Sequence, residues 1–256
     1  MLPMLLCASP LFAGETAPMM APAPSPVCDC PQGFTLGLEI LALKPYQSEG
    51  EYGDDGDYDA GFRGSIGYEF GDCLFIKATG FGYSTDLDDD DSSYDIDLDM
   101  GYVDLVVGQH FNQCDSLTLS PFVGLRWAML DEGWDDGYYT YDSSFDGIGI
   151  VLGIDATRTL GSNLSLYATA KQSIVFGTTD YEWGYKGDNY KDDDYSSDNV
   201  VFISELGLGL QYDFMFSNVA GNVRLGAEGQ WWSGASDEDS EDTGLAGFVL
   251  GANFRF

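Results

Sequence analysis

The stretch VLGANFRF, residues 249–256, closes the chain, and two kinds of side chain alternate along it. Counting from the preceding Phe248, apolar residues fill every second position, namely Phe248, Leu250, Ala252, Phe254 and Phe256. This period of two predicts a β-strand with one apolar face. A soluble domain usually frays into polar residues at its end, whereas this apolar face includes the final residue. We therefore expect the strand to be needed to its end.

The same two-residue alternation recurs from Gly33 onward, interrupted by polar and glycine-containing segments. No amphipathic helix separates the alternating stretches, and no apolar run approaches the roughly 18 residues of a transmembrane helix. The pattern is typical of an all-β domain. It predicts ten strands, near residues 33–46, 60–70, 74–85, 96–111, 117–130, 145–158, 164–178, 200–216, 222–232 and 244–256.

The connections between these strands are of two kinds, which alternate. Short turns follow the second, fourth, sixth and eighth strands, with the sequences GDC, NQCDS, TLGSN and NVAG. The odd-numbered strands are followed by long acidic loops that carry 30 of the 43 acidic residues, at 47–59, 84–95, 131–146, 178–199 and 233–243. An up-and-down arrangement puts all the short turns at one end, which is the signature of an outer-membrane β-barrel. Because lipid leaves no backbone group unpaired, we expect a closed antiparallel transmembrane barrel in which the first and last strands pair.

The two faces of the predicted strands differ as those of a membrane barrel do. Apolar residues fill one face, as in the series Leu206, Leu208 and Leu210, whereas the opposite face carries charge. We therefore expect apolar side chains toward lipid and charged side chains in the lumen. The candidate lumen residues are six basic and six acidic: Glu39, Arg63, Glu69, Lys77, Asp104, Arg126, Asp155, Lys171, Glu205, Arg224, Glu228 and Arg255. The alternative, a soluble β-sandwich with an acidic surface, explains neither the alternating connections nor these faces.

One strand breaks this phase. Asp97 and Asp99 fall on one face of the strand at 96–111, whereas Asp104 needs the opposite parity. We expect a β-bulge near Gly101 to restore the phase.

The beginning of the chain, MLPMLLCASPLFAGETAP, resembles an export signal, although it lacks a basic start. It has a short apolar core, followed by small residues near Ala13 and Gly14 where cleavage is plausible. The next residues are rich in proline and alanine, as linkers are. We expect a signal peptide at 1–14, a periplasmic linker at 15–32 and an outer-membrane barrel at 33–256.

Several stretches resemble the Legionella-type major outer membrane protein family: EILALKPYQSEG, GFRGSIGYEF, YVDLVVGQHF, LSPFVGLRWAML and FDGIGIVLGIDATRTLGSNLSLYATAKQSIVFG. The resemblance covers about residues 33–256. It implies a pore-forming barrel in the outer membrane of a diderm bacterium, and it brings no catalytic residues. The terminal Phe256 also resembles the signal by which the barrel assembly machinery recognises its substrates. The expected partners are therefore outer-membrane lipid, lipopolysaccharide and that machinery.

The charge of the chain limits its partners. A formal net charge of −33 repels nucleic acid and anionic surfaces unless cations mediate, so we expect no nucleic-acid partner. The acidic loops offer candidate ligands for Ca²⁺ or Mg²⁺, because Ca²⁺ takes about six to eight oxygen ligands. These candidates are Asp55, Asp57, Asp88, Asp90, Asp97, Asp237 and Asp239. They lack the bidentate glutamate of an EF-hand, and the alternative is that the loops are solvated and bind no metal. We expect no other cofactor.

Two functions fit these features. One is a narrow, cation-preferring porin or channel with long acidic extracellular loops. The other is a non-conducting structural or surface-interaction barrel, because ten strands enclose less space than the 16–18 of open porins, and a dozen charged residues can fill it with salt bridges. We expect no enzyme: the single histidine, His110, lies beside NQCDS, on the periplasmic side. A surface protease of this size uses a histidine at the extracellular rim.

Four cysteines remain after export, Cys28, Cys30, Cys73 and Cys114, and all four are expected at the periplasmic rim. That compartment is oxidising. Since the third and fourth strands are neighbours, we expect Cys73 to pair with Cys114. Cys28 and Cys30 are too close in sequence for an easy mutual bridge, so they are candidates for self-association or a link to the cell wall. The alternative is four independent thiols.

Overall fold

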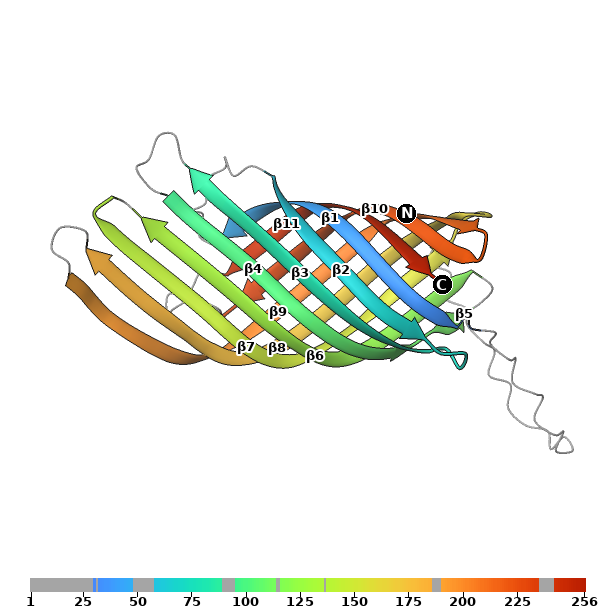
Figure 1. Ribbon diagram of the computed structural model, residues 1–256, viewed down its shortest axis with the longest axis horizontal. Helices are drawn as coiled ribbons and strands as arrows, with labels where there is room; N and C mark the ends of the chain where they lie inside the picture. The colour runs from blue at the N-terminus through green and yellow to red at the C-terminus, as the bar shows by residue number, and fades with distance from the viewer. Residues whose placement is uncertain are drawn as a thin grey trace, which may run out of the picture.

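The structure, a computed structural model, describes residues 30, 32–47, 58–88, 95–113, 116–135, 137–185, 190–234 and 242–256. Within these ranges every regular element is a β-strand, and the strands form one antiparallel barrel (Figure 1). None of the described residues belongs to a helix long and apolar enough to cross a membrane. The strands are β1 (Gly33–Gln47), β2 (Asp59–Glu69), β3 (Leu74–Asp88), β4 (Asp95–Gln109), β5 (Phe111–Gln113), β6 (Leu117–Asp135), β7 (Tyr139–Thr159), β8 (Leu164–Tyr185), β9 (Tyr190–Phe216), β10 (Val219–Ser233) and β11 (Thr243–Arg255).

The barrel closes through pairing of strands from the two ends of the chain. β1 pairs with β11 from Thr35 opposite Arg255 to Gln47 opposite Thr243. β4 pairs with β6, and the short β5 continues the line of β4 by pairing with the start of β6. The other strands pair with their neighbours in sequence. The predicted fold class, an up-and-down barrel of ten strands, is therefore confirmed, and closure pairs the backbone groups of what would otherwise be open edges.

The two ends of the barrel differ in their connections. We call one the turn end: it holds the short connections 70–73, 160–163 and 217–218, and also the break between β4 and β6. The start of β1 and the end of β11 lie there too, and the backbone N–H of Phe256 donates a hydrogen bond to the carbonyl of Phe34 at 3.0 Å. The opposite end, with the connections that follow β1, β3, β6, β8 and β10, is the loop end.

Two of the predicted long loops are wrong in their boundaries. Residues 131–146 and 178–199 are mostly strand. Only 136–138 separate β6 from β7, and only 186–189 separate β8 from β9. We call these two segments the extended hairpins; in Figure 1 they reach past the ends of β1 and β11. Strand prediction from an apolar lipid face failed there because the outer residues are polar, such as Asp142 and Asp180. Backbone pairing continues without that face.

The inside-out arrangement of the faces is present along the whole middle of the barrel. Leucine and isoleucine side chains on the outer surface are exposed, as with Leu206 at 69% and Ile148 at 61%. The alternate positions point inward and include buried charged residues, among them Arg126 and Glu205. The fold therefore presents an apolar band outward and polar groups inward, as membrane barrels do.

The bulge predicted near Gly101 is absent from β4. The ladder between β3 and β4 runs without interruption from Leu74 opposite Gln109 to Asp88 opposite Asp95. Asp97 and Asp99 are exposed and share the outer face with Val103, whereas Asp104 is buried inside. The prediction was wrong because acidic side chains on the outer face are tolerated at the loop end, above the apolar band.

Candidate functional site

The lumen contains an ion-paired group around Arg126 of β6. Its guanidinium donates hydrogen bonds to both carboxylate oxygens of Asp104 on β4, at 2.6 and 2.7 Å. It also lies 2.6 Å from the carboxylate of Glu205 on β9. Arg126 is completely buried. Because a buried charge is costly unless it is paired and hydrogen-bonded, these contacts explain how an arginine is held there.

A second group surrounds Arg63 of β2. Its guanidinium donates hydrogen bonds to Glu39 of β1 at 2.8 Å and to Glu228 of β10 at 2.9 Å. Glu39 faces Arg63 directly in the β1–β2 ladder, and it also pairs with Arg224 of β10. The group therefore joins three strands on both sides of the seam where the first and last strands meet.

Tyr102 and Lys171 extend the group around Arg126. The Tyr102 hydroxyl donates a hydrogen bond to Glu205 at 2.8 Å, and the Lys171 ammonium lies 3.1 Å from the same carboxylate. The Arg126 guanidinium lies 3.8 Å from the centre of the Tyr102 ring, close enough for a cation–π contact. The two groups form what we call the charged layer: Glu39, Arg63, Asp104, Arg126, Lys171, Glu205, Arg224 and Glu228.

The other four predicted lumen residues pair nearer the turn end. Lys77 lies 3.7 Å from Asp155, and Arg255 lies 3.2 Å from Glu69. These pairs are partly exposed and line the same cavity as the charged layer. The structure thus brings all twelve predicted charged residues into ion pairs.

The loop-end half of the lumen is filled by apolar side chains. They lie on the same inward strand faces as the charged layer but closer to the loop end. Leu41 is the next inward residue after Glu39, and Trp232 is the second inward residue after Glu228. Each has at most 5% of its surface exposed. We call this cluster the apolar layer: Leu41, Leu43, Phe81, Tyr83, Leu98, Met100, Tyr102, Ala128, Leu130, Phe145, Val175, Val201, Ile203, Trp232, Leu245 and Val249. The lumen is therefore closed here by packed side chains.

The turn-end half of the lumen holds a cavity of about 610 Å³. Its wall includes the carboxylates of Glu39 and Asp213, the basic groups of Lys171 and Arg224, and the amide of Asn253. Tyr167 lines it with a buried hydroxyl for which the described residues provide no hydrogen-bond partner. A polar space of this size is large enough for water or a small polar solute.

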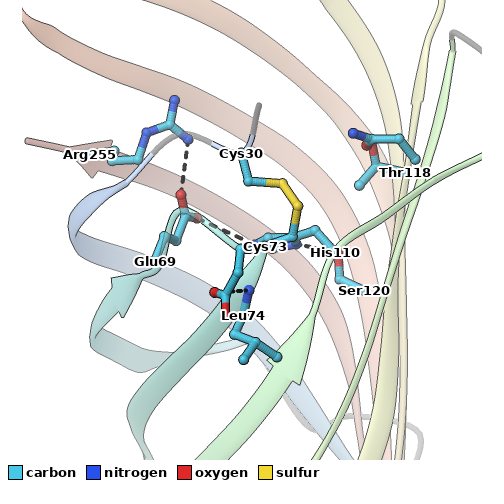
Figure 2. The surroundings of a disulfide bond; sticks show 10 residues. Cys30, Glu69, Cys73, Leu74, His110, Thr118, Ser120 and Arg255 are labelled. Atoms are coloured by element: carbon cyan, nitrogen blue, oxygen red, sulfur yellow. Dashed lines mark hydrogen bonds and ion pairs between the residues drawn. A yellow bond between two sulfur atoms is a disulfide. The ribbon is translucent and has the colours of Figure 1, made fainter. Parts of the chain in front are cut away.

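The disulfide at the turn end joins Cys30 to Cys73, with Cα atoms 5.0 Å apart (Figure 2). The predicted Cys73–Cys114 pairing is therefore wrong, and so is the assignment of Cys30 to a link between molecules. Gly33 faces Glu69 in the β1–β2 ladder, which brings the residues before β1 beside the turn after β2. Cys28 and Cys114 lie outside the described residues.

His110 lies at the turn end, as predicted, beside this disulfide (Figure 2). One ring nitrogen, Nδ1, lies 2.8 Å from the Ser120 hydroxyl, and Nε2 lies 3.7 Å from Glu69. The imidazole stacks on the Phe75 ring, with centroids 4.8 Å apart. These contacts join β2, β3 and β6 next to the bridge, far from the extended hairpins.

The predicted cation ligands fall mostly on residues whose structure is not described. Asp55, Asp57, Asp90, Asp237 and Asp239 lie outside the described residues, as does the side chain of Asp88. Asp97 is exposed on the outer face of β4. In the described part of the chain, no three histidine, cysteine, aspartate or glutamate residues gather as metal ligands.

The inner face of the extended hairpins carries aromatic rings. Tyr139 and Tyr185 lie opposite each other with ring centres 5.1 Å apart, and Tyr141 and Trp183 with ring centres 4.7 Å apart. Tyr181 stacks on Tyr195 at 4.6 Å. Burial raises the pKa of the Tyr141 hydroxyl to about 12, so it stays protonated at neutral pH.

Sequence reasoning missed the apolar layer and the aromatic inner face. The alternation of the strands contained the signal for both. Leu41 and Leu43 have the same inward parity as Glu39, and Tyr141 has the same parity as the buried Phe145. These residues were missed because apolar side chains were expected to face lipid, and only charged side chains were expected in the lumen.

Several solved outer-membrane protein structures are similar to this chain. The outer membrane protease OmpT from Escherichia coli is similar with a TM-score of 0.52 and 12% identity, over 88% of this chain and 97% of that one. A major outer membrane protein from Thermus thermophilus has a TM-score of 0.48 and 13% identity, over 88% and 99%. The toluene transporter TodX from Pseudomonas putida has a TM-score of 0.37 and 12% identity, over 88% and 90%. At such low identity the likeness to OmpT shows the fold alone.

A search of the curated proteins finds no significant match. The family model described as Legionella pneumophila major outer membrane protein precursor matches residues 27–256. This match spans the whole barrel and agrees with the resemblance of the motifs. The protein is thus an outer-membrane β-barrel, and its chain belongs to the Legionella pneumophila major outer membrane protein family.

Proposed function

We propose that this protein is a narrow porin that prefers cations and that is closed in the conformation described. The observation that supports it best is the polar cavity of about 610 Å³ between the turn end and the charged layer. Outer-membrane barrels have short turns on the periplasmic side, so this cavity faces the periplasm. Water and small ions then enter half of the lumen from that side.

The apolar layer is the gate in this proposal. Apolar constrictions close channels by excluding water, without blocking the pore by a separate plug. Trp232 is the largest of its buried side chains, and Leu130 and Leu245 belong to the same layer. Conduction requires these side chains to move apart, so the open state is the less populated one.

Cation preference follows from the acidic excess outside the lumen. The twelve charged lumen residues balance, whereas the chain as a whole carries −33. Carboxylates at the extracellular mouth raise the local cation concentration and repel anions. Salt screens this effect, because the Debye length is about 3 Å at 1 M.

A non-conducting structural barrel is the second candidate, and the apolar layer favours it. Its members are as buried as those of a soluble core, and barrels of about eight strands are commonly filled by side chains. In this case the acidic loops and extended hairpins carry the function by binding cations or partners.

Planar-bilayer recording of the purified barrel separates the two. The porin proposal expects brief openings of the unmodified protein, and longer or more frequent openings for Trp232→Ala. Trp127→Ala is the matched control, because Trp127 lies on the outer surface. If neither the unmodified protein nor Trp232→Ala conducts, the porin proposal is wrong and the structural barrel stands.

A further inference from the structure

The extended hairpins carry an exposed aromatic surface beyond the membrane band. Tyr139, Trp183, Tyr185 and Tyr195 are each between 42% and 50% exposed. They share the inner strand face with Ser143 and Thr179, which are buried within the barrel. The extended hairpins that carry these residues reach farther toward the loop end than β1 and β11, at the left of Figure 1.

The rings are held in place by one another. Tyr139 and Tyr185 face each other across the β7–β8 ladder, as do Tyr141 and Trp183. Tyr141 in turn contacts Tyr181, which is 1% exposed and anchors the set. Such prearranged rings give a partner large contact area at little entropic cost.

The charge around these rings limits the kinds of partner that fit them. Segments 131–146 and 178–199 together contain thirteen acidic and two basic residues. Glu132 has the inner parity of the rings, and Asp142, Asp180 and Glu182 are exposed on the outer face of the same strands. Lipid headgroup phosphates are repelled by this charge, and neutral sugars gain nothing from it.

We propose that the aromatic face of the extended hairpins docks a basic polypeptide, rich in arginine or lysine, from outside the cell. Guanidinium and ammonium groups stack on tyrosine and tryptophan rings, and nearby carboxylates strengthen the contact. Aromatic residues are also the usual anchors of protein interfaces. The proposal does not depend on whether the lumen conducts.

The test measures binding of fluorescent nona-arginine to the refolded full barrel in zwitterionic detergent at about 0.15 M NaCl. The variant Tyr139→Ser/Trp183→Ser/Tyr185→Ser is expected to weaken binding at least about tenfold. The variant Tyr139→Phe/Trp183→Phe/Tyr185→Phe keeps the ring faces and should keep most of the affinity. Tyr58→Ser is the matched control, because Tyr58 is 53% exposed but lies directly before β2, outside the extended hairpins.

Heat-modifiable gel migration checks that every variant is folded before binding is compared. Unchanged nona-arginine affinity in the serine variant overturns the proposal, because binding is then a general attraction to acidic loops. If the unmodified protein binds the neutral cellohexaose and the serine variant does not, the proposal is also overturned, in favour of a carbohydrate surface. Ring-dependent binding of nona-arginine with no binding of nona-glutamate or cellohexaose supports it.

Discussion

The Arg126 guanidinium and the Asp104 carboxylate form a two-pronged ion pair inside the barrel, with hydrogen bonds of 2.6 and 2.7 Å. The two residues face each other across the β4–β6 ladder, and neither has more than 4% of its side chain exposed. This pair lies next to the apolar layer, on the side of the turn end. The β4–β6 ladder is therefore the place where the fully buried Arg126 charge is neutralised.

Removing Arg126 is expected to destabilise the barrel strongly. Arg126→Ala leaves the carboxylates of Asp104 and Glu205 without their main partner, which costs about 3–5 kcal/mol of unfolding free energy. Urea titration in detergent, followed by heat-modifiable gel migration, measures the loss. Lys77→Ala is the control, since its pair with Asp155 is 3.7 Å long and a third exposed, and it should cost about 1 kcal/mol or less. Equal losses contradict this account of the lumen.

Ion selectivity is expected to depend on the lumen arginines. Arg224→Ala removes a positive charge from the cavity wall, so cation preference should increase in a conducting barrel. The reversal potential across a KCl gradient measures it, and the change should shrink in about 1 M salt. Arg158→Ala makes the same change of charge on the exposed outer surface and should have little effect. An anion-selective pore would be incompatible with the proposed porin.

The orientation of the barrel predicts which positions are reached from outside the cell. Cysteine at Ser144, on the exposed face of an extended hairpin, should react with a membrane-impermeant maleimide on intact cells. Cysteine at Asn163, in the β7–β8 turn, should react only after the outer membrane is opened. The unmodified protein supplies the background of its native cysteines. Reaction at Asn163 alone would reverse the orientation.

The disulfide predicts equal effects of two single substitutions. Cys30→Ser and Cys73→Ser open the same bridge, which spans 43 positions, so each should lower stability by about 2–4 kcal/mol. The double variant should lose no more than either single one, and Cys114→Ser should leave stability unchanged. Non-reducing peptide mapping should recover Cys30 joined to Cys73, and a Cys73–Cys114 peptide would refute the assignment.

The last residue is expected to matter for assembly more than for stability. Phe256 has 61% of its surface exposed and contributes one described backbone hydrogen bond, to Phe34. Phe256→Ala should therefore refold in detergent with nearly unchanged stability, yet reach the outer membrane less efficiently. Cell fractionation measures how much protein reaches the outer membrane, and the refolding yield in detergent measures folding without the cell. Comparing the two separates these effects. Equal losses in both assays would show that Phe256 acts through packing.

The lipid and lumen faces could be read from local sequence because β-strand geometry is local. Side chains alternate at every residue, so Leu206 and Glu205 must point to opposite faces wherever the strand lies. Short turns after alternate strands then fixed up-and-down order, and closure followed from the need to pair every edge in lipid. These features determined the fold class and the parity of all twelve lumen charges.

Distances across the lumen could not be read in this way, because they depend on how the strands are staggered around the barrel. Parity places Leu41, Trp232 and Phe145 inside but does not say that they meet and close the channel. The same holds for Cys30, whose partner was decided by the β1–β2 register. The sequence by itself determined that this protein is a membrane barrel with a charged interior. The tertiary structure alone decided that an apolar layer closes the lumen, because only the closed, staggered sheet sets which inward side chains touch.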